Sequence, residues 1–129
     1  MNRRMFIAAT ATLGYGLMLS PVGAGGITPY DRESFSRAIA AGPVVVHVHA
    51  VWCLVCKTQL PTLSALAQDA KLANVQFISV NFDKDKDFLK VNKVANQSVI
   101  VVFKGGKEVQ RLSGTTDPTE IRDGILNAL

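Results

Sequence analysis

Cysteine is scarce in this chain, which has only two among its 129 residues. They are Cys53 and Cys56, and a bridge between them would close a very short loop and remove little chain entropy from the unfolded state. A disulfide that only staples the fold is therefore a poor explanation for the pair. Redox chemistry and metal binding are the uses that fit this spacing.

The chain also lacks a strong charge of one sign, internal repeats and low-complexity tracts. Its formal net charge is +4, and Arg3 and Arg4 of the N-terminal segment supply half of that excess. The other charges are interspersed and give no nucleic-acid footprint, so we expect no nucleic-acid partner. With 48% hydrophobic and 19% charged residues, the composition is that of one globular domain.

The apolar segment near the N-terminus is short for a membrane span. It covers residues 5–19, follows two arginines and leads into small residues that end at Ala24. This order is typical of an export signal, so we predict a signal peptide over residues 1–24 and a domain over residues 25–129 in the periplasm. The alternative is an uncleaved membrane anchor. An Arg-Arg-x-Phe-Ile pattern resembles a twin-arginine signal.

One stretch changes from a strand pattern to a helix pattern at the cysteine pair. Residues 44–48 are rich in β-branched side chains and follow a Gly-Pro pair, which predicts a buried strand. From Leu54 onward the apolar residues recur at helical spacing. Cys53 therefore lies at a helix start, where orphan backbone N–H groups and the helix dipole favour a thiolate. We expect Cys53 to be the more exposed and more acidic thiol, and Cys56 to be buried.

The remaining segments predict a single α/β domain. We expect a linker over residues 25–30 and a redox helix from Leu54 to about Ala73. The other elements are a helix over 31–41, a strand over 75–82, a helix over 83–93, strands over 98–104 and 107–113 around a Gly-Gly turn, and a helix from Asp117 that buries Ile121, Ile125 and Leu126. A helical crossover and an antiparallel hairpin then give a central mixed four-stranded sheet with helices on both faces.

Several motifs in this order resemble those of the thioredoxin family, across nearly all of residues 25–129. They are Trp52-Cys53-x-x-Cys56-Lys57, Pro61, Asp83, Phe103-Lys104-Gly105-Gly106 and Gly114. The resemblance implies a thioredoxin-like fold and thiol-disulfide exchange through a redox-active disulfide, with Cys53 as attacking thiolate and Cys56 as resolving thiol. No cofactor is expected. Trp52 is predicted to contact substrate, with plain packing of the indole as the alternative.

Two departures from the family pattern surround the cysteines. Leu54-Val55 replaces the usual Gly-Pro, and because this dipeptide tunes thiol acidity, the direction of exchange does not follow from the resemblance. His47 stands at the position of a buried carboxylate and His49 at that of an aromatic residue, both on one face of the strand. We expect His47 to exchange a proton with Cys56, because an imidazole titrates near neutral pH. The alternative is that either histidine is a hydrogen-bonded core group.

A third departure is Ser98, which stands where the family has a cis-proline. In the family that proline orients the client chain and keeps metals away from the thiols. A cis bond before a residue other than proline costs about 3 kcal/mol, so we expect a trans bond before Ser98. Ser98 and Val99 are predicted to contact substrate.

The leading functional prediction is a periplasmic protein-disulfide oxidoreductase that acts as a reductase or electron carrier. It implies disulfide-bonded client proteins, a membrane electron-donor relay protein and a monomeric state. A disulfide-donating oxidant is the alternative within this class. Outside it, the alternatives are a zinc or copper protein with His47, His49, Cys53 and Cys56 as ligands, and a thioredoxin-fold binding module or assembly chaperone whose cysteines are incidental.

Overall fold

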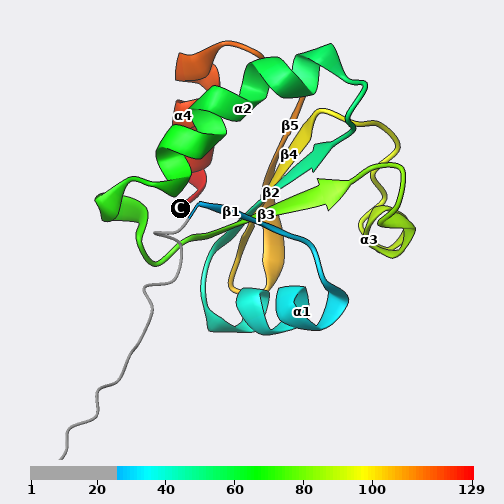
Figure 1. Ribbon diagram of the computed structural model, residues 1–129. Helices are drawn as coiled ribbons and strands as arrows, with labels where there is room; N and C mark the ends of the chain where they lie inside the picture. Colours follow the sequence, from blue (N-terminus) through cyan, green and yellow to red (C-terminus); the bar gives the residue numbers. More distant parts are fainter. Residues whose placement is uncertain (1–25) are drawn as a thin grey trace, which may run out of the picture.

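Five strands form one mixed sheet in the computed structural model, which describes residues 26–129 (Figure 1). They are β1 (Ile27–Pro29), β2 (Val44–His49), β3 (Gln76–Asn81), β4 (Val99–Lys104) and β5 (Lys107–Ser113). Their order is β1-β3-β2-β4-β5. β3 runs parallel to β1 and β2, whereas β4 is antiparallel to β2 and β5. The predicted mixed sheet and α/β class are therefore confirmed.

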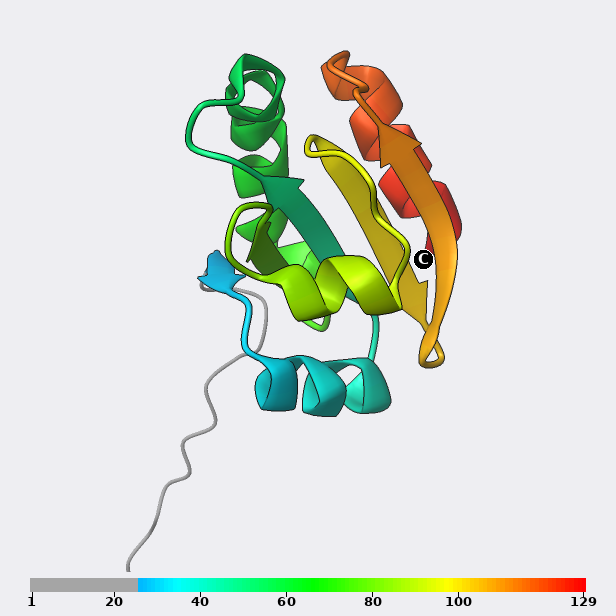
Figure 2. The same ribbon diagram turned by 90° about the vertical axis from the view of Figure 1, so that its right-hand side faces the viewer.

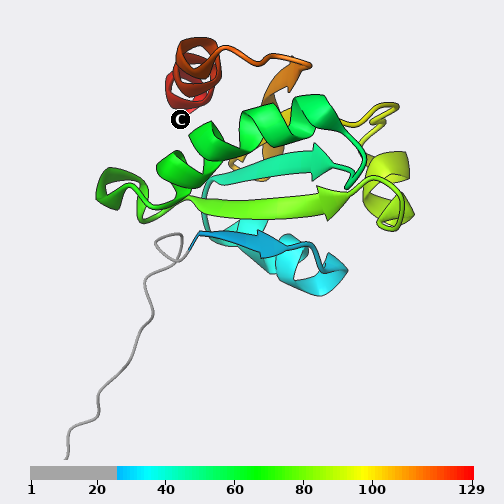
Figure 3. The ribbon, with the colours of Figure 1, turned by 45° about the horizontal axis from the view of Figure 1, so that its top comes forward.

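Helices cover both faces of this sheet, as predicted. α1 (Arg32–Ala41) and α3 (Lys86–Val91) lie on one face, and α2 (Leu54–Ala67) and α4 (Pro118–Ala128) lie on the other (Figures 2 and 3). Within the described residues, no helix combines the length and apolarity that a membrane crossing requires. The predicted signal peptide over residues 1–24 lies outside the described residues.

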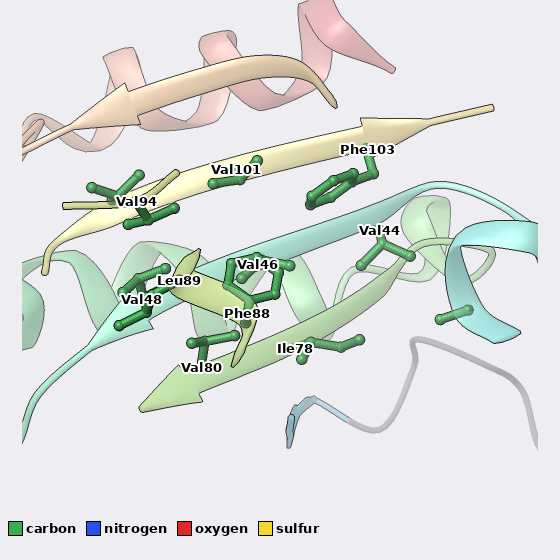
Figure 4. Close-up of a cluster of buried hydrophobic side chains, with 12 residues drawn as sticks. Val44, Val46, Val48, Ile78, Val80, Phe88, Leu89, Val94, Val101 and Phe103 are labelled. Atoms are coloured by element: carbon green, nitrogen blue, oxygen red, sulfur yellow. The ribbon is translucent and has the colours of Figure 1, made fainter. Parts of the chain in front are cut away.

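Strand β2 contributes side chains to both hydrophobic cores. Val44, Val46 and Val48 point toward α1 and α3, where they pack in one cluster with Phe88 (Figure 4). Val45 belongs to the other cluster, with residues of α2 and α4. A strand that is covered on both faces needs apolar residues at successive positions, which explains the uninterrupted valine run.

The prediction of a four-stranded sheet is wrong by one strand, because residues 25–30 are not a plain linker. Ile27–Pro29 forms β1 at the sheet edge, in parallel register with β3, and Ile27 lies opposite Phe77. A strand this short has no visible alternation, and Pro29 lacks the N–H group that a ladder uses. The sequence alone therefore indicated a linker.

Helix ends differ from the prediction by a few residues. α2 stops at Ala67, and a 3-10 turn (Ala70–Leu72) follows it, capped by the carboxylate of Asp69. α3 is shorter at both ends than the predicted 83–93 segment. The end of α2 depends on backbone capping contacts of Gln68, which hydrophobic spacing does not report, and no side-chain capping contact marks the start of α3.

The last helix begins where predicted. The Asp117 carboxylate accepts hydrogen bonds from two N–H groups of the first turn of α4. Ile121 and Ile125 are buried, but Leu126 is 40% exposed, so its predicted burial is wrong. Residues four apart share a helix face, whereas the next residue is rotated by about 100°.

Candidate redox site

Cys53 and Cys56 form a disulfide at the N-terminus of α2. Cys53 is the N-cap residue and has extended backbone angles, φ −93° and ψ 111°. The backbone N–H of Cys56 donates to Cys53 Sγ at 3.1 Å, in the way that it would to a capping oxygen. The predicted position of Cys53 at the helix start is confirmed. A donor at this distance stabilises negative charge on Cys53 Sγ once the disulfide is reduced.

Both cysteines are buried in the disulfide form. Cys53 is 4% exposed and Cys56 is 3% exposed, and both belong to a small cluster with Ala50 and Phe82. The expectation of a clearly more exposed Cys53 is wrong for this redox state, because the bridge turns its sulfur toward Cys56 and the apolar cluster. Exposure therefore does not distinguish the two sulfur atoms in this form, whereas the place of Cys53 at the helix start does.

Exposed apolar side chains surround the disulfide. They belong to Val51, Trp52, Leu54 and Val55. Trp52 is 56% exposed, so it is not a core aromatic, and its indole N–H donates to Asp83 Oδ2 at 2.9 Å. This hydrogen bond orients the ring beside the buried bridge.

His47 is buried and hydrogen-bonded to Gln59 of α2. His47 Nε2 lies 2.9 Å from Gln59 Oε1, and the Gln59 amide nitrogen donates to the carbonyl oxygens of Ser98 at 3.1 Å and Thr115 at 2.9 Å. Carbonyl oxygens only accept hydrogen bonds, so the amide nitrogen must face them and Oε1 must face the imidazole. Neutral His47 therefore carries its proton on Nε2 and keeps its lone pair on Nδ1.

The pKa of His47 is lowered from 6.5 to about 4. Burial is the main cause, since it penalises the imidazolium; the Gln59 hydrogen bond opposes this effect and nearby His49 adds to it. The expectation that His47 titrates near neutral pH is therefore wrong for the disulfide form. At neutral pH the His47 ring is therefore uncharged. A nearby negative charge would be needed to stabilise its protonated form at this buried position.

The predicted pairing of the two histidines on one strand face is confirmed. Their rings stack with centroids 5.8 Å apart and an interplanar angle of 24°. They share a cavity of about 250 Å³ with Cys56; it is lined by Ile27, His47, His49, Cys56, Leu60 and Ser79. The structure thus brings three polar residues singled out in the sequence to one place.

Ser98 lies close to Cys56 through a shared partner, the carbonyl oxygen of Val48. This oxygen accepts the N–H of Ser98 at 2.8 Å and lies 3.8 Å from Cys56 Sγ. The reduced Cys56 thiol therefore has an acceptor for its proton. Every peptide bond within residues 26–129 is trans, so the expected trans bond before Ser98 is confirmed.

The backbone of Ser98 is left-handed, with φ +61°. Such a conformation costs a residue other than glycine roughly 1 kcal/mol or more. Its carbonyl oxygen accepts from the N–H of Gly114 at 2.9 Å and from Gln59. The side chain of Val99 is buried in a core cluster. Ser98 is also buried, so Ser98 and Val99 offer little side-chain surface and few free polar groups to a ligand.

The geometry does not support the metal-binding alternative. Among residues 26–129, no group of three or more His, Cys, Asp and Glu side chains is arranged to hold a metal ion. The two sulfur atoms are joined to each other, so neither is a free thiolate in this structure. Tetrahedral zinc would need these groups as free ligands.

Comparisons with known proteins agree with this geometry. The sequence profile described as Thioredoxin matches residues 26–127. The chain belongs to the thioredoxin family. A thioredoxin of Chlamydia trachomatis is 36% identical over 87 residues, which cover 67% of this chain and 83% of the relative. Thioredoxin-2 of Saccharomyces cerevisiae is 30% identical over 97 residues, which cover 74% of this chain and 90% of the relative.

A solved structure supports the same assignment. The crystal structure of Trxlp from Edwardsiella tarda superposes with a TM-score of 0.74 at 35% identity, covering 77% of this chain and 97% of that one. Thioredoxins are thiol-disulfide oxidoreductases, and this chain has the required cysteine pair at disulfide distance. The predicted family, fold and enzyme class are therefore confirmed. The location in the periplasm stays a prediction.

Sequence reasoning missed Gln59, which is fully buried in this thioredoxin-family site. Gln59 lies one turn after Cys56 on the face of α2 that also carries Leu63 and Leu66. A polar residue inside an apolar helical stripe was the available signal, because a buried amide needs partners. The partners themselves come from distant segments and could not be named from the sequence.

Proposed function

We propose that this thioredoxin-family enzyme is an exported reductase or electron carrier that reduces disulfides of client proteins. The observation that carries the proposal is the 3.1 Å hydrogen bond from the Cys56 N–H to Cys53 Sγ. It favours Cys53 as the thiolate that attacks a client disulfide. The relatives named thioredoxin support the reducing direction.

The proposed reaction has two exchange steps. In the first, the Cys53 thiolate attacks one client sulfur, and the electron pair of the broken client bond leaves on the other client sulfur. In the second, the Cys56 thiol loses its proton and attacks Cys53 Sγ, which releases the second client thiolate. The client gains two electrons from the enzyme and two protons, one released by Cys56 and one taken from solvent, and the enzyme returns to the disulfide form.

We assign client contact to the surface around the disulfide. Trp52 is exposed there together with Val51, Leu54 and Val55, and an apolar patch of this kind suits an extended client segment. Ser98 and Val99 border the same site through the Val48 carbonyl. Because their polar groups are used internally, we assign them a role in shaping the client surface.

We assign to His47 the acceptance of the Cys56 proton in the second step. His47 is neutral at neutral pH, and it lines the same cavity as Cys56. A forming thiolate nearby would offset the burial that lowers its pKa. An imidazole in the basic form that faces the same cavity as the reacting thiol can act as a general base.

We place the enzyme in the periplasm on the strength of its N-terminal residues, which have the order of an export signal. There it would need a membrane relay protein as electron donor, and we propose that it acts as a monomer. A fusion of residues 1–24 to a reporter enzyme that folds only with disulfides tests the location. Activity of the reporter in cells supports export. A fusion that stays in the cytosol and is inactive contradicts it.

The redox potential of the Cys53–Cys56 couple tests the direction of exchange. Equilibration in glutathione or dithiothreitol buffers, followed by alkylation and mass analysis, measures it. A value near roughly −270 mV supports a reductase, whereas one near roughly −120 mV would replace the proposal with a disulfide-donating oxidant.

Trapping of the mixed disulfide tests the roles of the two cysteines. In Cys56→Ser, the second step is blocked, so a client should remain bound to Cys53 and be released by dithiothreitol. Cys53→Ser is the matched variant and should trap no client. Trapping by Cys53→Ser instead would reverse the assignment.

A further inference from the structure

Three segments of the protein meet at the side-chain amide of Gln59. Its oxygen accepts from His47 on β2, and its nitrogen donates to Ser98 before β4 and to Thr115 after β5. Gln59 itself lies on α2, one turn after Cys56. Both N–H groups and the oxygen are therefore engaged, and the residue is fully buried. The side-chain amide of Gln59 therefore connects the redox helix to the neighbouring strand and loops through hydrogen bonds.

The Ser98 turn, residues 97–99, depends on hydrogen bonds of this kind. Ser98 has a left-handed backbone, which serine does not favour. Its N–H is held by Val48, and its carbonyl oxygen by the N–H of Gly114 and by Gln59. Only the Gln59 contact comes from a side chain. Replacing Gln59 therefore removes one of the two hydrogen bonds to the Ser98 carbonyl oxygen and leaves the backbone hydrogen bond from Gly114 in place.

The Ser98 turn is also tied to the redox centre. The Val48 carbonyl that holds the Ser98 N–H is the oxygen next to Cys56 Sγ. A shift of the turn would therefore change the surface beside the disulfide while leaving the two sulfur atoms on α2 and its cap in place.

We propose that Gln59 is a positioning residue that holds the Ser98 turn in the shape that receives a client protein. This inference rests on the proposed function, in which Ser98 and Val99 shape the client surface. A protein disulfide must fit its chain against that surface before its sulfur reaches Cys53. A small aromatic disulfide needs only access to the sulfur, so it does not depend on the turn.

Gln59→Leu separates the two kinds of substrate, because leucine is similar in volume and makes no hydrogen bonds. We expect kcat/KM for insulin reduction to fall about tenfold or more, mainly through KM. The rate with 5,5′-dithiobis(2-nitrobenzoate) should change less than about threefold. Gln68→Leu is the matched control, since Gln68 is exposed at the C-terminal end of α2. It should leave both substrates unaffected.

A second substitution tests whether the loss comes from the turn. Glycine adopts a positive φ without strain, so Ser98→Gly should restore part of the insulin activity of Gln59→Leu. His47→Leu removes the partner of the Gln59 oxygen. It should lower the rates of insulin and 5,5′-dithiobis(2-nitrobenzoate) reduction by the same factor, because both reactions need the Cys56 proton to be accepted. A loss of core stability alone would lower both activities of Gln59→Leu by the same factor, so their ratio would stay at the wild-type value and Ser98→Gly would not change it.

Gln59→Glu serves if Gln59→Leu does not fold. It keeps the side-chain shape, but a carboxyl group donates at most one hydrogen bond, so the insulin-specific loss should be smaller and still present. An unchanged ratio of the two activities in a folded variant overturns the inference, and so does failure of both variants to fold. Wild-type protein that reduces neither substrate would instead overturn the proposed function.

Discussion

The two faces of the sheet use alternate residues of the same strand for different purposes. On the face of α1 and α3, β2 contributes only valines, and the rings of Phe35, Phe88 and Phe103 meet edge to face behind them. On the face of α2 and α4, β2 contributes Val45 and then His47 toward the redox end. The side chains of β2 on one face are all apolar, and those on the other face become polar where the disulfide lies.

This difference separates the energetics of the two faces. The apolar face is stabilised by buried area, so its losses should scale with the volume that a substitution removes. The redox face relies on a few specific hydrogen bonds among buried groups, where each missing partner leaves a costly unsatisfied atom. Substitutions on the first face should change stability, and those on the second should change chemistry.

Cys53→Ser should have the largest effect and should act only on chemistry. Without the attacking thiolate, insulin reduction should fall on the order of a thousandfold or more. Under reducing conditions, where both proteins lack the bridge, the urea midpoint should change little. A turbidity assay and urea unfolding followed by circular dichroism measure the two. Substantial remaining activity would show that Cys56 can start the reaction alone.

Phe88→Ala should have the largest effect on the apolar face. Phe88 is fully buried against Phe35 and Phe103, so its truncation should lower the free energy of unfolding by about 3–5 kcal/mol. Activity per folded molecule should stay at the wild-type level. Val91→Ala is the control on α3, because Val91 is exposed, and it should cost less than about 0.5 kcal/mol. A redox defect in folded Phe88→Ala would break the separation of the faces.

The pH dependence of stability should report the burial of His47. Its pKa is about 4 in the folded protein and 6.5 when solvated, so the unfolded state binds the extra proton between these values. The stability linked to this ring is complete above pH 6.5 and is lost as the pH falls toward 4, by up to about 3 kcal/mol. His47→Leu should lose that much less between pH 7 and pH 4 in urea unfolding. Equal losses in the two proteins would contradict the low pKa.

Tyr30→Phe should have the smallest effect, on the α1 and α3 side of the sheet. The Tyr30 hydroxyl donates to Asp87 Oδ2 at 2.7 Å, and its loss should cost about 1 kcal/mol. In an Asp87→Asn background the same change should cost less, because the charged acceptor is gone. Thermal unfolding of the four proteins measures this coupling. The redox potential should be the same in all of them.

The elements that the sequence predicted well carry local signals. In the valine run, the Gly-Gly hairpin and the helix cap at Asp117, a few neighbouring residues are enough to predict the local structure. Strand β1 was missed because only its pairing with β3 defines it. The end of α2 was missed because contacts after the helix, including the Asp69 cap of the 3-10 turn, determine where it stops. At the site, Cys53 at the helix start was predictable from the strand-to-helix change.

The state of the histidines was not predictable in the same way. The alternation of β2 correctly put His47 and His49 on one face. The pKa of His47 depends instead on burial under α2 and on Gln59, which is twelve residues away along the chain. Ordinary imidazole chemistry therefore gave the wrong titration range.

The order of residues by itself determined the family, the redox pair and which of its sulfur atoms begins the helix, because these follow from short-range pattern and spacing. Only the tertiary structure decided that both cysteines are buried in the disulfide form, that His47 is neutral and that Gln59 joins three segments. The reason is physical: burial and hydrogen-bond partners belong to the space between segments, which exists only once the chain has folded.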